Sequence, residues 1–114
     1  MARKVSKKSS YKERVAKMQA IVLTYQKANL YLNMLERKVY VLNEKTDEDK
    51  IQEYKNCRLL FETFFNTLEE DEKLIIMNDF YERLNVNWWI GTYSRSTYYR
   101  IKNRAIDRML FYYE

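Results

Sequence analysis

The stretch MQAIVLTYQKANLYLNMLERKVYVL, residues 18–42, carries two series of apolar residues that each repeat every seven positions. The first series is Met18, Tyr25, Leu32 and Val39, and the second is Ile21, Ala28, Leu35 and Leu42. Because the series are three residues apart, they form the a/d stripe of a helix that buries one side. A helix over residues 11–43 would be about 50 Å long, more than the width of so small a domain. The stripe therefore indicates either one long core helix or a coiled coil that joins two copies of the chain.

The composition favours helices for the rest of the chain as well. The 114 residues are the size of a single domain, and they include 11 Tyr, 5 Phe and 2 Trp as core material. The chain has no proline and one glycine, Gly91, whereas the turns of a sheet protein favour both residues. We therefore expect an all-α protein built from few, long helices.

The missing residue types exclude several kinds of chemistry. Without histidine there is no imidazole base or imidazole metal ligand, and the single cysteine, Cys57, cannot form an internal disulfide or a thiolate metal site. Cys57 falls on an apolar helix face, where a small core residue is expected. One glycine excludes a P-loop and a dinucleotide fingerprint. We expect no cofactor and no metal site.

The sequence also bears on location. No apolar run reaches the roughly 20 residues that span a bilayer, and the N-terminus lacks the apolar centre of a signal peptide. We therefore expect a cytoplasmic protein with no membrane partner.

Charge is distributed unevenly along the chain. Residues 1–17 hold seven Lys/Arg and one Glu, residues 44–72 hold four Lys/Arg and ten acids, and residues 92–114 hold five Lys/Arg and two acids. Basic ends attract polyanions, nucleic acid first and anionic membrane second, although charge runs are also ordinary solvated faces. Residues 1–9 have almost nothing apolar to bury, which predicts a flexible basic arm. The expected phosphate-contacting residues of the arm are Arg3, Lys4, Lys7, Lys8 and Lys12.

Two helices are expected in the acidic middle. Thr46 and Asp49 resemble a capping box and predict a helix over residues 47–66, with an apolar face that includes Phe61 and Phe64. Thr67 and Glu70 form a second capping box, ahead of a helix over residues 68–84. The expected division is a helical pair over residues 10–66, which is also the candidate dimerisation region, and a helix-turn-helix region over residues 67–114.

The last quarter of the chain has the order of a helix-turn-helix. In NVNWWIGTYS, residues 85–94, Val86 and Ile90 fit one face of a short helix that Gly91 ends. Ser94 is a good N-cap for the final helix.

The final helix has one apolar face, made by Tyr98, Ile101, Ala105 and Met109. Its remaining surface is polar and basic, as a helix that enters the major groove requires. The expected DNA-contacting residues are Ser94, Arg95, Ser96, Thr97, Tyr99, Arg100, Lys102, Asn103 and Arg104.

The segment LEEDEKLIIMNDFYERL…WWIGTYSRSTYYRIKNRAIDRML, from Leu68 onward, resembles region 4 of sigma-70-type factors. It is most similar to the sigma-region-4-like regulators of phage late genes, the ArpU/RinA type, whose reading helix begins with Ser followed by apolar residues at the spacing of Ser94, Tyr98 and Ile101. Trp88 and Trp89 depart from the family pattern, as does one extra residue before Ser94. The resemblance implies a phage or bacterial transcription regulator that binds double-stranded DNA.

Two functions from different classes follow from these patterns. The first is a DNA-binding transcription regulator that reads the major groove with its C-terminal helix-turn-helix. The second is a helical interaction protein that contacts RNA polymerase, or a homodimer joined through residues 11–43, without reading DNA sequence. An enzyme is not expected, because the acidic clusters at residues 47–49 and 69–72 lie at helix starts, where acids have a structural role.

Overall fold

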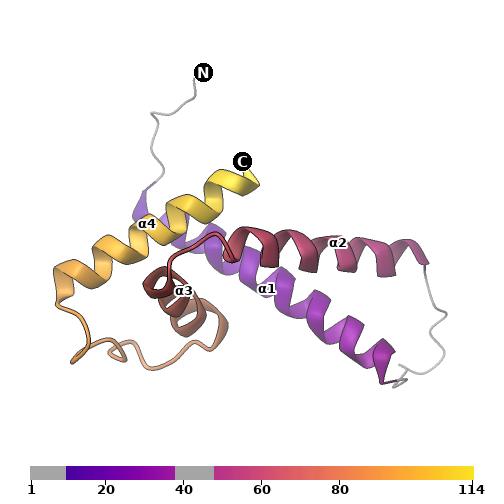
Figure 1. Ribbon diagram of the computed structural model, residues 1–114, viewed down its shortest axis with the longest axis horizontal. Coiled ribbons are helices and arrows are strands. Elements are labelled where there is room, and N and C mark those ends of the chain that lie inside the picture. Colours follow the sequence, from indigo (N-terminus) through magenta and orange to yellow (C-terminus); the bar gives the residue numbers. More distant parts are fainter. Residues whose placement is uncertain (1–9, 38–47) are drawn as a thin grey trace.

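The computed structural model describes residues 10–37 and 48–114, and within these residues every regular element is a helix. The elements are α1 (Tyr11–Glu36), α2 (Glu48–Phe65), α3 (Glu70–Ile76), the π-helical turn η1 (Met77–Tyr81) and α4 (Arg95–Tyr113). Figure 1 shows α1 and α2 as a hairpin that extends away from α3 and α4. The expected all-α bundle with a long N-terminal helix is confirmed.

Helix α1 begins where the sequence predicts. The Ser10 N–H donates to the Glu13 carboxylate at 3.0 Å, and the Ser10 hydroxyl accepts the Glu13 N–H at 3.1 Å, which completes a capping box. The described helix ends at Glu36. The rest of the predicted span, with Val39 and Leu42, lies outside the described residues, as does Thr46.

The buried stripe of α1 follows helical rather than strict heptad spacing. Met18, Ala28 and Leu32 of the predicted stripe are buried, whereas Tyr25 is only half-buried. Val22, which the heptad pattern left out, is fully buried. This outcome agrees with a core helix, whose apolar side recurs at every third or fourth residue.

Helix α2 matches its predicted bounds within one residue at each end. It packs on α1 largely through aromatic rings. The ring centroids of Tyr25 and Phe61, which are stacked, lie 4.1 Å apart, and those of Tyr31 and Tyr54 lie 4.7 Å apart. Cys57 is half-buried, and burial raises the pKa of its thiol above the ordinary value. A raised pKa lowers the thiolate fraction of Cys57 at neutral pH, but the residue is only half-buried and is not the core residue that the sequence predicted.

The helix predicted over residues 68–84 differs at both ends. Thr67 donates its hydroxyl to the Phe64 carbonyl and closes α2, and α3 begins later, where the Glu69 N–H donates to Glu72 at 2.8 Å. The capping pair is therefore Glu69 and Glu72, because Thr67 is used by the preceding helix. The following helical turn widens into η1 and ends at Tyr81, and Leu84 is exposed.

The short helix predicted around residues 86–90 does not form. This segment is a series of turns, with Val86 79% and Ile90 61% exposed. The expectation was wrong because Trp88 and Trp89, rather than Val86 and Ile90, anchor the segment. Trp89 is buried and stacks on Tyr98 at 4.4 Å. The predicted turn at Gly91 is present, with φ at +100°. Residues 82–94 therefore connect η1 to α4 without an intervening helix.

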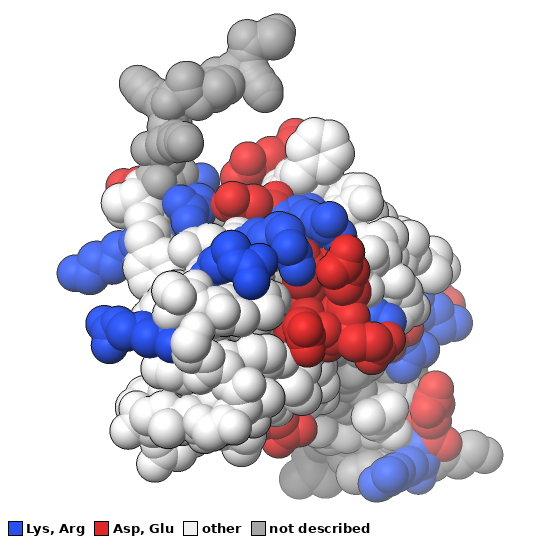
Figure 2. Space-filling view, turned by 60° about the vertical axis from the view of Figure 1, so that its left-hand side comes forward, with Lys and Arg blue, Asp and Glu red and all other residues white. Residues whose placement is uncertain are grey.

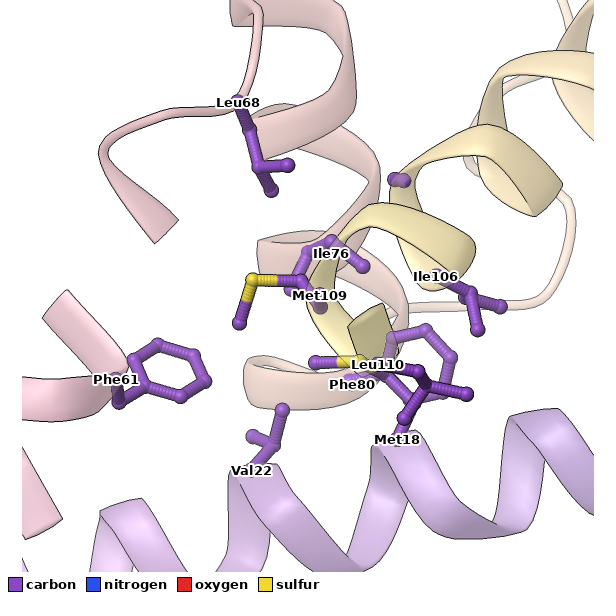
Figure 3. Packing of buried hydrophobic residues seen from close by; sticks show 10 residues of the cluster. Met18, Val22, Phe61, Leu68, Ile76, Phe80, Ile106, Met109 and Leu110 are labelled. Carbon is purple, nitrogen blue, oxygen red and sulfur yellow. The ribbon is translucent and has the colours of Figure 1, made fainter. Parts of the chain in front are cut away.

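One core joins the hairpin to the C-terminal helices. Figure 3 shows side chains from α1, α2, α3, η1, α4 and the α2–α3 link pointing toward one another. They include Met18, Val22, Phe61, Leu68, Ile76, Phe80, Ile106, Met109 and Leu110. The two regions that the sequence analysis separated near residue 66 therefore share a single packed interior, and the outer side of α4 is left for contacts.

Candidate nucleic-acid interface

The N-terminus of α4 is built by local hydrogen bonds. Ser94 is the N-cap, and its hydroxyl oxygen accepts the Thr97 N–H at 3.2 Å, as predicted. The Ser94 hydroxyl also donates to the Thr97 hydroxyl at 2.9 Å. These bonds fix the first turn while both hydroxyl oxygens stay near the surface.

The predicted apolar face of α4 is the face that the protein buries. Tyr98, Ile101, Ala105 and Met109 are at most 5% exposed. Ile106 and Leu110 are buried as well and widen this face toward α1. With one side fixed in this way, the opposite side of α4 must face outward, because successive residues are about 100° apart around a helix.

Five of the nine predicted contact residues remain accessible on the first turns of α4 or at its cap. Ser94, Arg95, Ser96 and Arg100 are exposed, and Thr97 is half-buried. No carboxylate of residues 10–37 or 48–114 forms an ion pair with Arg95 or Arg100. The two guanidinium groups are therefore available to an anionic partner.

The Tyr99 ring lies against the Arg95 guanidinium. The Arg95 guanidinium lies 5.5 Å from the centroid of the Tyr99 ring, and the ring itself makes edge contacts with Tyr11 and Trp89. A cation over an aromatic face is attracted by the ring, which restricts the orientation of Arg95. Tyr99 itself is half-buried.

Lys102 corrects the prediction most clearly. Its side chain is 12% exposed, its ammonium lies 3.1 Å from Asp79, and the rings of Tyr11, Phe80 and Tyr98 surround it at 5.5–5.7 Å. Burial, the largest single influence, would lower the pKa of Lys102, but the Asp79 carboxylate together with Tyr11 and Tyr98 outweighs it and raises the pKa above the ordinary value. Lys102 is therefore a nearly buried cation that joins α4 to η1, and its ammonium is not exposed in the way that the predicted DNA contact requires.

Asn103 and Arg104 also have partners within the protein. The Asn103 side-chain oxygen accepts a hydrogen bond from Arg14 at 2.9 Å, which ties α4 to α1. Arg104 donates to the fully buried Glu72 at 2.7 Å and lies 3.4 Å from Glu69, which ties α4 to α3. These two residues position α4, and Arg104 keeps a side chain that is 38% exposed.

Acidic groups lie close to this basic face. Glu72 is buried beneath α4, and Asp107 pairs with Arg14 at 3.2 Å. Asp71 accepts the Tyr93 hydroxyl at 2.7 Å; burial first, and this hydrogen bond second, raise the pKa of Tyr93 to about 12. Figure 2 shows blue and red side chains next to one another at the centre of this face. Among the arginines of α4, Arg95 and Arg100 in the first two turns have no carboxylate partner among the described residues, whereas Arg104 and Arg108 pair with Glu72.

The basic arm falls mostly outside the described residues. Lys12 lies in the first turn of α1 and is exposed. Arg3, Lys4, Lys7 and Lys8 lie outside the described residues.

Sequence reasoning missed two arginines on this side of the molecule. Arg108 lies 3.3 Å from Glu72, and Arg14 pairs with Asp107 and Asn103 across the α1–α4 contact. The spacing of Arg104 and Arg108, four residues apart on one helix, was the available signal, because both then face the acidic start of the same neighbouring helix.

The described part of the chain holds neither a metal-binding cluster nor a membrane-spanning helix. No group of three or more acidic or cysteine side chains is arranged there to hold a metal ion. None of the described helices combines the length and the apolar character that crossing a bilayer requires.

Comparison with protein-family models, with curated proteins and with solved structures found no match to this chain.

Proposed function

We propose that this protein is a transcription regulator that binds double-stranded DNA through the first turns of α4. The observation that carries the proposal is the two-sided character of that helix. Its apolar side is locked into the core, while Arg95, Ser96 and Arg100 are exposed at its start. The resemblance of residues 68–110 to sigma-region-4-like regulators supports the same function.

The chemistry of these residues suits base reading. An arginine donates two parallel hydrogen bonds to a guanine edge in the major groove, and a serine contacts several bases. Arg100 is the best candidate for base contact, because it lies on the outer side of the second turn and has no carboxylate partner among the described residues. Arg95, held by the Tyr99 ring, is placed for a phosphate or a flanking base.

The residues with internal partners take a supporting part in this proposal. Lys102, Asn103 and Arg104 fix α4 to η1, α1 and α3, so that the base-contacting residues are presented on a rigid element. The cations of the predicted arm, which include the exposed Lys12, supply phosphate contacts that do not depend on sequence.

Selection of bound duplexes from a random pool tests this function. Repeated rounds with the full chain are expected to enrich a short common motif, which then binds the chain more tightly than a scrambled duplex of equal length. A pool that stays random after selection, with equal affinity for all duplexes, would contradict sequence reading.

A second candidate function is protein interaction through the α1–α2 hairpin. Leu23 and Leu30 are seven residues apart on α1 and are 43% and 62% exposed, and Leu59 of α2 is 65% exposed. Exposed leucines at heptad spacing favour a partner helix, from a second copy or from an RNA polymerase subunit. Sedimentation separates these cases: Leu30→Glu is expected to dissociate a homodimer, whereas a wild-type monomer would exclude one.

A further inference from the structure

A cleft of about 720 Å³ lies along the outer side of α4, beyond the turns proposed to contact bases. Its walls come from α4 and from the link between α2 and α3. The lining residues are Thr67, Arg100, Asn103, Arg104, Asp107, Arg108, Phe111 and Tyr112. Arg108 and Phe111 have no part in the proposed base contact, so this half of the cleft calls for a separate explanation.

Three guanidinium groups follow the length of the cleft. Arg100, Arg104 and Arg108 are each four residues apart, which places them about 6 Å apart along the helix axis. The one carboxylate among the lining residues is that of Asp107, which already pairs with Arg14 at 3.2 Å. The cleft therefore presents a row of three guanidinium groups, of which Arg104 and Arg108 also pair with carboxylates of the neighbouring α3 end, Glu69 and Glu72.

The buried Glu72 holds two of these arginines in place. Its side chain is 0% exposed, and it accepts from Arg104 at 2.7 Å and from Arg108 at 3.3 Å. A guanidinium carries five N–H donors, so each arginine keeps donors for a second partner. Glu72 cannot be reached by a ligand, and by fixing both side chains it reduces the entropy that a bound anion would otherwise cost them.

The row continues the surface proposed to contact bases. Ser96 and Arg100 lie on the same outer side of α4 as Arg104, Asp107 and Phe111, because positions spaced three or four residues apart share one side of a helix. Phe111 is 76% exposed at the far end of the cleft. A polyanion that reaches Arg100 from the N-terminal turns would therefore pass over Arg104 and Arg108.

We propose that this cleft binds phosphates of the DNA backbone, with Arg108 and Arg104 as the contacting residues, next to the bases contacted from the first turns of α4. The inference rests on the proposed function and adds to it a phosphate contact at Arg108, which the sequence did not indicate, beside Arg104, which it did. Contacts to phosphate fix the register of a protein on the duplex without reading sequence. Arg108 is therefore expected to affect affinity and its salt dependence, and not the preference for one sequence.

The test measures anisotropy of a labelled duplex, taken from the selected pool, over a series of salt concentrations. Arg108→Gln is expected to make the log–log salt dependence less steep by about 0.9, the effect of one lost phosphate contact. The ratio of affinities for selected and scrambled duplexes is expected to stay as in wild type. Arg37→Gln, which changes an exposed arginine at the end of α1, is the matched control and is expected to leave the slope unchanged.

A second substitution keeps the test valid if Arg108→Gln unfolds the chain. Phe111→Glu adds a negative charge at a side chain that is 76% exposed, so the fold is expected to persist while duplex affinity falls several-fold. An unchanged slope in folded Arg108→Gln, or unchanged affinity in Phe111→Glu, would overturn the phosphate site. If the phosphate site were overturned but Arg100→Ala still weakened duplex binding, the proposed DNA-binding function would be retained without the phosphate site. If wild type bound no duplex, both proposals would fail.

Discussion

The Lys102 ammonium lies 3.1 Å from the Asp79 carboxylate, between the rings of Tyr11, Phe80 and Tyr98. Both charged side chains are nearly buried, at 12% and 11% exposure. Asp79 also accepts the Trp88 N–H at 2.6 Å and the Tyr98 hydroxyl. This one carboxylate therefore joins η1, the 82–94 connection and α4, and it sets the orientation of the helix proposed to read DNA.

Removing Asp79 is expected to cost more stability than removing Lys102. Asp79→Ala leaves a buried ammonium without its carboxylate and takes the acceptor from Trp88 and Tyr98, at a cost of about 3–5 kcal/mol. Lys102→Met places an apolar chain among aromatic rings and leaves Asp79 with two donors, so we expect a cost at least about 1 kcal/mol smaller. Urea unfolding followed by circular dichroism measures both, and equal costs would argue against this arrangement.

The 82–94 connection predicts opposite outcomes for two apolar residues. Trp89 is buried against Tyr98, so Trp89→Ala is expected to lower the free energy of unfolding by about 3–5 kcal/mol. Val86 is 79% exposed, so Val86→Asp is expected to change it by less than about 0.5 kcal/mol. Thermal unfolding distinguishes the two, and a large loss in Val86→Asp would favour the helix that the sequence predicted.

The two arginines that share Glu72 are expected to contribute unequally. Arg104 donates to Glu72 at 2.7 Å and Arg108 at 3.3 Å. Because the Arg104 side chain is 38% exposed, solvent screens part of this interaction, and we expect Arg104→Met to cost about 1–2 kcal/mol. Arg108→Met is expected to cost clearly less. Chemical unfolding of both variants checks the order, and a reversed order would contradict the observed geometry.

Stability is expected to fall in alkaline solution, in part through Tyr25. Burial, followed by the hydrogen bond to Glu62, raises the pKa of Tyr25 from 10.0 to about 12. The folded state then holds this proton more tightly than the unfolded state, so the contribution is complete below pH 10.0 and is lost as the pH rises to about 12. Tyr25→Phe is expected to lose less stability over that interval, as measured by urea unfolding at several pH values. Parallel losses in the two proteins would exclude this contribution.

Local signals in the sequence were sufficient for much of the fold. The N-termini of α1 and α4 follow from Ser10 and Ser94. Each serine is an N-cap whose hydroxyl accepts a backbone N–H in the first turn of its helix. The buried face of α4 follows from helical spacing, which acts within one element. The path of the 82–94 connection depends instead on the packing of Trp89 against Tyr98, a contact that no local pattern contains.

The exposed residues of the candidate site could be predicted from the sequence to a similar extent. The accessible side of α4 was correctly expected at Arg95, Ser96 and Arg100, because it lies opposite the apolar stripe. The ion pair of Lys102 was not predicted, because its carboxylate comes from a different element, 23 residues earlier in the chain. One signal was present: Lys102 lies four residues after Tyr98, on the edge of the buried face.

The most direct test of the central claim compares Arg100→Ala with Arg37→Ala on the selected duplex. A good arginine–guanine contact is worth about 1–3 kcal/mol, so Arg100→Ala is expected to weaken binding by roughly 5- to 150-fold and to reduce the preference over a scrambled duplex. Arg37→Ala removes the same charge from the hairpin and is expected to bind as wild type does. DNA reading by α4 would be contradicted if the two variants bound the selected duplex equally tightly and preferred it over the scrambled duplex to the same degree.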